Sequence, residues 1–203
     1  MASYSKEDRR VRRSKRLIAE AFIELMYIKD YDDISVTDIV ILADYNRTTF
    51  YRHFENKEDL LYKIVTYYSK EIINSFKKPY KNNNYVRLER LTEDDITIFK
   101  HVMEHSDFYL LWNKFEKIPG FEEQFLRSIA SFYKNEIALI NIPVKGLNKS
   151  LYTTFYAYGI LGLVLDWIKA GLNESPDYMA KQLCKILNYH PSESYLKRAT
   201  HRQ

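Results

Sequence analysis

The sequence is poor in the residues that shape disulfide-rich and β-rich proteins. Its 203 residues include one cysteine, five glycines and five prolines. The single cysteine, Cys184, excludes an intramolecular disulfide and favours the reducing cytoplasm as the compartment. So few glycines and prolines argue against the many tight turns of a β-sheet protein. The long periodic apolar stretches between them predict an all-α fold.

Long apolar runs are also absent. The longest, residues 155–165, has 11 residues, which is too short to span a bilayer. No apolar segment of the signal-peptide kind follows the charged N-terminus. We therefore expect a cytoplasmic protein with no membrane contact, in which residues 155–165 form a buried helix.

Positive charge is concentrated at the N-terminus. The formal net charge is +4, yet residues 1–16 hold seven Lys and Arg against Glu7 and Asp8, a balance of +5, so the other 187 residues sum to about −1. A positive arm in front of a near-neutral body is typical of proteins that bind a polyanion. The alternative is a solvated, disordered tail.

Four amphipathic helices are predicted in the N-terminal part. Apolar residues recur at helical spacing over residues 14–27 and again over 36–43, where Ser35 and Asp38 form a capping-box pattern. After a break at 44–46, Asn46 caps a third helix that begins at Arg47, and Asn56 caps a long fourth helix. A polar stretch, 78–87, follows, so we expect one domain at 1–77 and a second at 78–203.

The second and third of these helices have the proportions of a helix-turn-helix unit. Phe50 and Phe54 share one face of the third helix, while hydroxyl and guanidinium side chains cover the other. Small hydroxyls permit a close approach to DNA, Arg47 can bond guanine, and Tyr51 and His53 can bond phosphate oxygens. The alternative is a helical hairpin with an ordinary solvated face.

The residues of this unit also match a known pattern. The match consists of Thr37, Ile39, Ala43, Thr49, Phe50, Tyr51, His53, Phe54, Lys57, Leu60 and Leu61. Through them, residues 36–65 resemble the DNA-binding domain of the tetracycline-repressor (TetR) family. One departure is Asp44-Tyr45, where the family usually has Gly-Val, although Asp tolerates a left-handed backbone. The resemblance implies a double-stranded DNA operator, contacted by Thr37, Arg47, Thr48, Thr49, Tyr51, Arg52, His53 and Lys57. We add the capping residue Asn46 to these DNA-binding candidates.

Residues 78–203 are predicted to form a helical regulatory and dimerisation bundle. Helices are expected at about 92–105, 107–117, 121–140, 147–170 and 176–189. Residues 155–183 resemble the closing helix pair of the TetR-like regulators of dihydroxyacetone kinase operons, and in this family that pair commonly forms the dimer interface. The helix from Phe155 is apolar around most of its circumference, which independently favours packing on two sides.

We therefore expect a homodimer, with the central helix of a monomeric bundle as the alternative. The expected interface residues are Tyr158, Gly159, Gly162, Leu165, Met179 and Leu183.

Aromatic residues are abundant in the second part, and aromatic walls suit a largely apolar effector. The candidate pocket residues are His101, His105, Phe108, Trp112, Phe132, Phe155 and Tyr158. The alternative for most of these rings is ordinary core packing.

One pattern points to a different class of protein. Residues 101–105, HVMEH, match H-x-x-E-H, in which His101 and His105 would bind zinc and Glu104 would activate water. Three fixed residues without further support make a zinc hydrolase a remote alternative. We expect no enzymatic activity, cofactor or metal.

These patterns together predict a homodimeric transcriptional regulator. We expect a repressor that binds a palindromic operator and is released by a small molecule. The alternative within regulation is a TetR-like activator or adaptor that responds to a protein partner.

Overall fold

The computed structural model describes residues 9–80, 90–115, 117–136 and 145–188. Within these ranges the chain forms helices and no strand, which confirms the all-α prediction. In chain order the elements are α1 (Arg9–Ile28), η1 (Tyr31–Asp33), α2 (Val36–Leu42), α3 (Arg47–His53), α4 (Lys57–Lys77), η2 (Lys78–Tyr80), α5 (Ile98–Glu104), α6 (Ser106–Tyr109), α7 (Trp112–Phe115), α8 (Phe121–Glu136), α9 (Lys149–Lys169) and α10 (Pro176–Asn188).

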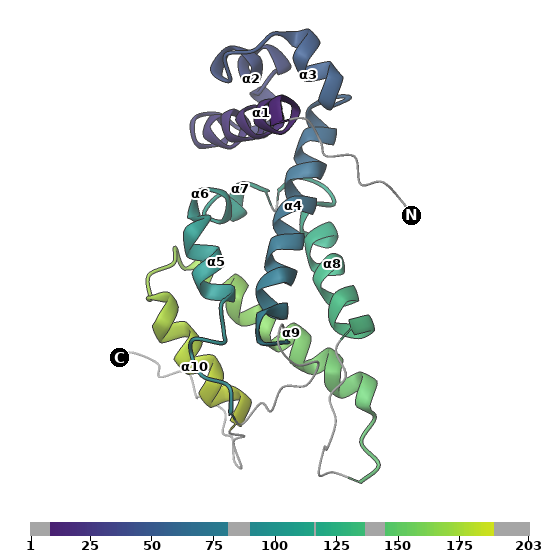
Figure 1. The fold of residues 1–203 in the computed structure, drawn as a ribbon, viewed down its shortest axis with the longest axis vertical. Helices are drawn as coiled ribbons and strands as arrows, with labels where there is room; N and C mark the ends of the chain where they lie inside the picture. Colours follow the sequence, from purple (N-terminus) through teal and green to yellow (C-terminus); the bar gives the residue numbers. More distant parts are fainter. Residues whose placement is uncertain (1–8, 81–89, 116, 137–144, 189–203) are drawn as a thin grey trace, which may run out of the picture.

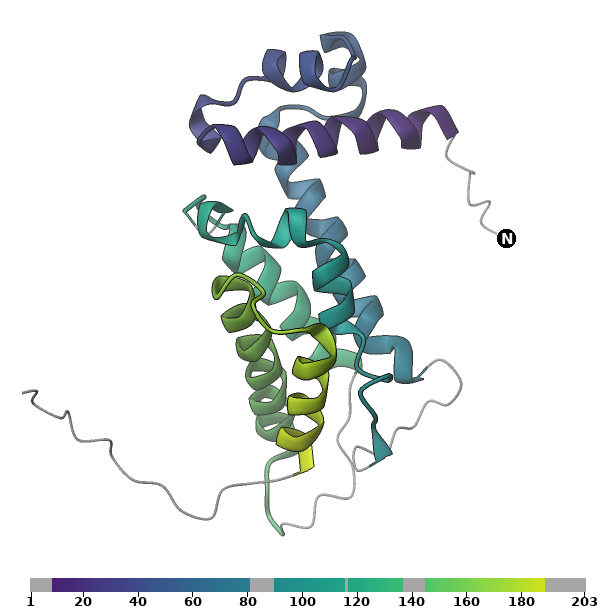
Figure 2. The same ribbon diagram turned by 90° about the vertical axis from the view of Figure 1, so that its left-hand side faces the viewer.

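Helices α1 to α3 form a small unit at one end of the molecule (Figure 1). Phe22 of α1, Ile39 of α2 and Phe50 of α3 are fully buried where the three helices meet. Burying side chains of this size stabilises a fold by about 1.5–3 kcal/mol each. Figure 2 shows α1 lying crosswise to α4, above the regulatory bundle.

The helix ends in this unit follow the predicted caps. Ser35 and Asp38 form a complete capping box at the start of α2, and the side chain of Asn46 accepts a hydrogen bond from the Thr49 N–H. Asn56 caps α4 in the same way. Asp44 adopts the left-handed backbone that the turn requires, with φ at 56°. Replacement of the usual glycine therefore leaves the turn intact.

Helix α4 runs from the DNA-binding end down through the regulatory bundle (Figure 1). Helix α8 lies beside it in the same direction, since Gln124 Nε2 donates to Thr66 Oγ1 at 3.1 Å and Lys77 pairs with Glu136 at 2.6 Å near the other end. Helices α5 and α6 cover another side of α4, where Tyr68 stacks on Phe108 with ring centroids 3.9 Å apart. A change in the bundle can therefore reach the DNA-binding unit through α4.

The segment before α8 differs from the prediction of two continuous helices. Residues 92–97 form a turn in place of helix, because the backbone N–H and hydroxyl of Thr92 both donate to Asp95 Oδ2, at 3.0 and 2.9 Å. At His105 the backbone leaves the helical region, with φ −119° and ψ 35°, and this separates α5 from α6. The predicted helix at 107–117 is split into α6 and α7. Residues 137–140 of the helix predicted at 121–140 lie outside the described residues.

Helix α9 differs from the buried helix that was expected. By length and composition it is long and apolar enough to cross a membrane, although its longest purely apolar run is not. Only 33% of the 18-residue segment of α9 that is apolar enough to span a membrane is buried in the subunit. Leu151, Phe155 and Tyr158 project from its exposed side. Length and composition alone are weak grounds for a membrane span, but the exposed apolar side of α9 has to be explained.

Candidate DNA-binding surface

Helix α3 buries one face and exposes a row of hydrogen-bond donors on the other. Phe50 is fully buried, whereas the side chains of Arg47, Thr48, Tyr51 and Arg52 are exposed. The helix lies at the end of the molecule farthest from α10 (Figure 1). An exposed helix with these donors fits the major groove of DNA, whose base edges and phosphates both accept hydrogen bonds.

Arg47 and Tyr51 contact each other one turn apart. The Arg47 Nη2 donates to the Tyr51 hydroxyl at 3.2 Å, and the guanidinium carbon lies 5.8 Å from the centroid of the Tyr51 ring. Thr49 is half-buried, and both its backbone N–H and its hydroxyl donate to Asn46 Oδ1, at 2.8 and 3.0 Å. The oxygen of Asn46 is therefore used in capping α3.

His53 joins α3 to α1. Its Nε2 lies 2.7 Å from the Ser14 hydroxyl. Because that hydroxyl donates to the Val11 carbonyl at 3.0 Å, it accepts from the Nε2–H of His53. Phosphate binding was expected of His53, but this nitrogen is engaged within the protein. The bond holds the basic start of α1 against the end of α3.

Lys57 is engaged inside the DNA-binding unit as well. Its Nζ donates to the Tyr31 carbonyl at 2.6 Å and lies 4.2 Å from the centroid of the Tyr31 ring. The Tyr31 hydroxyl donates to Glu58 Oε1 at 3.2 Å, and burial together with the Glu58 charge raises the pKa of this phenol. Lys57 thus fastens the η1 turn to α4. Thr37, the remaining expected contact, is exposed in the first turn of α2.

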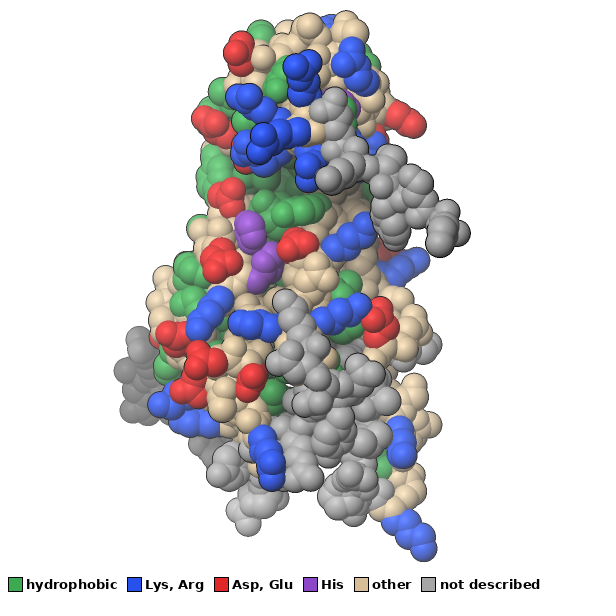
Figure 3. Space-filling view, viewed as in Figure 1, with side chains coloured by type: hydrophobic (Ala, Val, Ile, Leu, Met, Phe, Trp, Pro, Cys, Tyr) green, Lys and Arg blue, Asp and Glu red, His purple; other side chains and the backbone are tan. Residues whose placement is uncertain are grey.

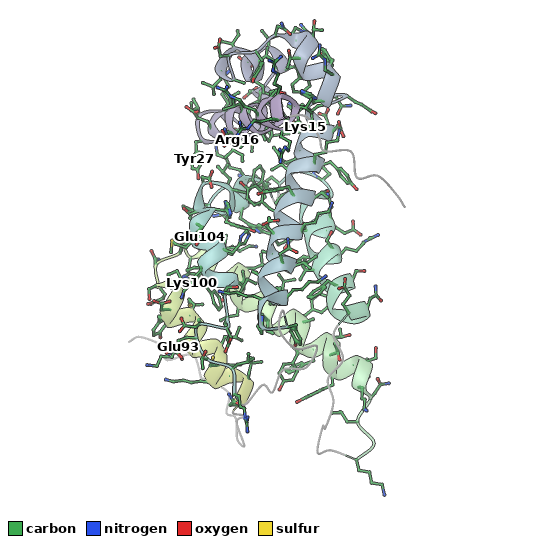
Figure 4. All side chains as sticks on the ribbon, in the orientation of Figure 1. Lys15, Arg16, Tyr27, Glu93, Lys100 and Glu104 are labelled. Carbon is green, nitrogen blue, oxygen red and sulfur yellow. The ribbon has the colours of Figure 1, made fainter. Side chains whose placement is uncertain are left out.

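Lys and Arg side chains gather over the same end of the molecule (Figure 3). Arg12, Arg13 and Arg16 are exposed along α1, and Arg16 pairs with Glu20 at 2.7 Å. Figure 4 labels Lys15 and Arg16 on the side of α1 that faces the viewer. Residues 1–8 of the predicted basic arm lie outside the described residues. Positive charge next to exposed donors suits the phosphate backbone of DNA.

Comparison with known proteins agrees with this geometry. Residues 18–64 match the family described as "Bacterial regulatory proteins, tetR family", and residues 89–189 match "Transcriptional regulator C-terminal region" of TetR-type proteins. This chain belongs to the TetR family. The matched families are described as transcriptional regulators, which sets aside the zinc-hydrolase alternative of residues 101–105.

Similar proteins include two curated regulators and many solved structures. The chain is 26% identical over 182 residues (89% of this chain) to the uncharacterized HTH-type transcriptional regulator YxbF of Bacillus subtilis (strain 168). It is 38% identical over 85 residues (41% of this chain) to the HTH-type dhaKLM operon transcriptional activator DhaS of Lactococcus lactis subsp. lactis (strain IL1403). The matched part spans just under half of each relative, 46% of its length. A putative TetR-family regulator from Syntrophomonas wolfei shares the fold at 21% identity, with a TM-score of 0.67 over 86% of this chain and 93% of that one.

The regulatory domain of this TetR-family chain brings several candidate pocket residues together. His101 Nε2 lies 3.0 Å from the Tyr109 hydroxyl, and the His101 and His105 ring centroids are 4.8 Å apart. Burial, with a smaller effect from His105, lowers the pKa of His101 to about 4, so the ring is neutral at physiological pH. Phe108, Trp112 and Phe132 are buried. In the described part of the chain, no three His, Cys, Asp or Glu side chains are arranged to hold a metal ion.

Two candidate pocket residues lie elsewhere. Phe155 is 70% exposed and Tyr158 is 51% exposed, both on the outer side of α9. Tyr158 nevertheless lines an open groove between α8 and α9. Helical periodicity identified an apolar helix but not which of its sides faces the bundle.

The expected dimer residues also divide into two sets. Tyr158, Gly159 and Gly162 are exposed on α9, and a Cβ added at either glycine would meet no atom within 4 Å. Leu165 is half-buried. Met179 and Leu183 of α10, at 7% and 3% exposed, pack into the core of their own subunit. Beside the exposed side of α9, a groove of about 990 Å³ lies between α8 and α9.

One contact between the two parts of the molecule had no signal in the sequence. Lys114 of α7 donates to the carbonyls of Met26 at 2.6 Å and Lys29 at 3.3 Å, at the end of α1. The Tyr27 hydroxyl donates to the Asp107 carbonyl at 2.7 Å. The C-terminal end of α1 is thus attached to the α6–α7 segment, which was predicted only as a helix of the second domain.

Proposed function

We propose that this TetR-family chain is a cytoplasmic, homodimeric repressor that binds a palindromic operator and is released by a small molecule. The observation that carries the proposal is the exposed donor face of α3, backed by Phe50 and flanked by the basic surface of α1. Arg47, Thr48 and Arg52 are the residues assigned to base edges, and Tyr51 is assigned to phosphate. His53 and Lys57 position the helix through Ser14 and Tyr31.

The proposed dimer interface is the exposed side of α9. Leu151, Phe155 and Tyr158 form a stripe at helical spacing, with Gly159 and Gly162 beside it. An apolar stripe of this kind gains free energy by burial against a second copy, and the open space at both glycines permits close helix contact. A twofold dimer would present two α3 helices to the two half-sites of a palindrome.

The proposed release mechanism uses α4. This helix begins directly after the DNA-binding unit and packs against α5, α6 and α8 of the bundle. An effector that favours a different tilt of α4 would change the separation of the two recognition helices from the roughly 34 Å that successive major grooves require.

The test is selection of fragments of the source genome by the full-length protein, followed by footprinting. We expect a protected site with two inverted half-sites whose centres lie about one helical turn apart. Selection of fragments without a shared motif, or of a single unrepeated half-site, would contradict the proposal.

An activator that responds to a protein partner is the second candidate. It is favoured by the L. lactis relative, which is named as an activator of the dhaKLM operon. Transcript levels of the genes beside the selected site, in cells with and without this protein, distinguish the two. Higher transcript levels without the protein indicate a repressor, and lower levels indicate an activator.

A further inference from the structure

Two buried polar atoms in the described part of the chain have no hydrogen-bond partner. They are Ser69 Oγ on α4 and Trp112 Nε1 on α7, and their residues are 2% and 1% exposed. Buried polar groups in proteins are nearly always hydrogen-bonded, because an unpaired group has lost its water without replacement. Both atoms lie where α4 packs among the helices of the regulatory bundle, so a ligand bound in the bundle could pair with them.

The position of Ser69 follows from its stripe on α4. Tyr62, Ser69 and Phe76 are seven residues apart and therefore lie on one side of the helix. The hydroxyl of Thr66, one turn before Ser69, accepts from Gln124 Nε2 at 3.1 Å, and the Phe76 ring lies 6.5 Å from that of Phe132. Ser69 therefore faces the middle of α8, between Gln124 and Phe132.

Trp112 packs on the first turns of α8. Its ring centroid lies 5.0 Å from that of Phe121 and 5.0 Å from that of Phe125, both fully or nearly fully buried. Tyr109 is adjacent, with its ring 6.5 Å from that of Phe125. Ring contacts connect the two residues: Tyr68, the neighbour of Ser69, lies 5.8 Å from Tyr109, Tyr109 lies 6.5 Å from Phe125, and Phe125 lies 5.0 Å from Trp112.

The region offers no charge to balance an ion. Among the described residues of the regulatory part, the buried polar side chains are Ser69, His101 and Thr153, and no Lys, Arg, Asp or Glu is buried. His101 is neutral at physiological pH because burial lowers its pKa to about 4. An ionised ligand would lose its hydration without a counter-charge.

We propose that Ser69 and Trp112 are the polar anchors of an effector site for an uncharged, mainly apolar molecule that carries a carbonyl or ether oxygen. The indole N–H can only donate, so the ligand must supply an acceptor, whereas the Ser69 hydroxyl can donate or accept. The inference deepens the proposed function, since it rests on control of this chain by a small molecule.

The test uses three fluorinated probes of similar size with the full-length protein. They are 4-fluoroacetophenone, which is neutral with a carbonyl acceptor, 4-fluoro-α-methylstyrene, which replaces that oxygen by CH₂, and the anion 4-fluorobenzoate. Fluorine NMR line broadening measures the binding of each. We expect the ketone to bind more tightly than the alkene and the anion, by about fivefold or more, as for one additional buried hydrogen bond.

Two variants link this preference to the proposed atoms. Trp112→Phe and Ser69→Ala should each weaken ketone binding by about fivefold. Ser69→Ala should leave the Tm of the ligand-free protein unchanged or higher, because it removes an unpaired polar atom. Trp112→Phe leaves a cavity and should lower the Tm, but by less than Trp167→Phe, which loses a hydrogen bond as well. The matched controls are Trp167→Phe and Ser75→Ala, whose side chains donate to the Glu174 carbonyl at 3.1 Å and the Ile72 carbonyl at 2.6 Å. The controls should lower the Tm and leave the preference for the ketone unchanged.

Three results would overturn the proposal. They are failure of the ketone to bind, equal binding of the three probes, and a fall in Tm for Trp112→Phe as large as that for Trp167→Phe, which would indicate a buried water as the partner. DNA affinity without probe is measured separately. Absence of specific DNA binding would contradict the proposed function but not the ligand site. Ketone binding that leaves operator affinity unchanged would likewise contradict release by a small molecule and leave the ligand site standing.

Discussion

The contact of Lys114 with α1 yields a quantitative prediction about how the two parts of the molecule are held together. The lysine ammonium donates to the Met26 and Lys29 carbonyls, at 2.6 and 3.3 Å. Because α1 ends at Ile28, no further helical turn supplies N–H groups to these two carbonyls. Lys114→Met keeps most of the side-chain volume and removes the charge and the donors. We expect the protein to fold with a loosened end of α1.

The magnitude follows from the geometry. A hydrogen bond from a charged group contributes about 1.5–3 kcal/mol, and a cation at a helix C-terminus contributes about 0.3–1 kcal/mol more. Lys114 is half-buried, so water replaces part of the loss in the variant. We expect the free energy of unfolding to fall by about 2 kcal/mol.

Urea unfolding at a fixed protein concentration measures this loss, because the stability of the proposed dimer depends on concentration. Hydrogen exchange should increase in the last turn of α1 and remain unchanged in α10. Lys117→Met is the control, since Lys117 is exposed two residues beyond α7. A change below about 0.5 kcal/mol for Lys114→Met, or an equal loss for Lys117→Met, would refute the assigned role.

Four further predictions concern DNA binding, assembly and pH. Arg47→Ala should cost about 1–3 kcal/mol at one base pair per half-site and relax the preference there, whereas Tyr51→Phe should weaken all sequences about equally; selection from randomised operators checks both, and a uniform loss for Arg47→Ala would make it a phosphate contact. Gly162→Arg should yield folded monomers with reduced operator affinity, measured by sedimentation, and a persisting dimer would place the interface elsewhere. Ser14→Ala should weaken DNA binding while leaving base preference unchanged, because it removes the bond from His53 to α1; a changed preference in the same selection would count against a positioning role. The pKa of His101 is about 4 in the folded protein and about 6.5 in the unfolded chain, so the free energy of unfolding should fall as pH falls from about 6.5 towards 4. The urea midpoint should drop less between pH 7.5 and 5.5 in His101→Gln than in the unmodified protein. Equal drops would show that His101 does not cause the pH dependence.

Local patterns predicted the DNA-binding unit closely. Caps at Ser35, Asn46 and Asn56, and the left-handed turn at Asp44, depend on side chains that bond or strain their own neighbouring backbone. Such interactions are encoded within four or five residues, so the sequence is sufficient to predict them. The burial of Phe50 with exposure of Arg47 likewise follows from helical periodicity.

The tertiary structure decided which of these side chains are available for DNA. Thirty-nine positions separate His53 from Ser14, and 26 separate Lys57 from Tyr31. No local pattern encodes a partner at that distance, because it depends on how α1 crosses α3 and how η1 meets α4. Residues that looked equivalent on a helical projection therefore fall into two groups. Arg47 and Arg52 are exposed donors, whereas His53 and Lys57 form hydrogen bonds within the protein.

The same limit applies to the regulatory part. The sequence predicted an apolar helix at 147–170, but not which of its sides faces the bundle. Phe155 was therefore expected in a pocket and is 70% exposed. Met179 and Leu183 were assigned to an interface although they fill the subunit core. The unpaired atoms of Ser69 and Trp112, like the attachment of Lys114 to α1, depend on three or more helices meeting. The amphipathic pattern by itself determined that helices would form and bury apolar surface, because burial is non-directional. The tertiary structure decided which residues became partners, because hydrogen bonds and close contacts require particular atoms at particular distances.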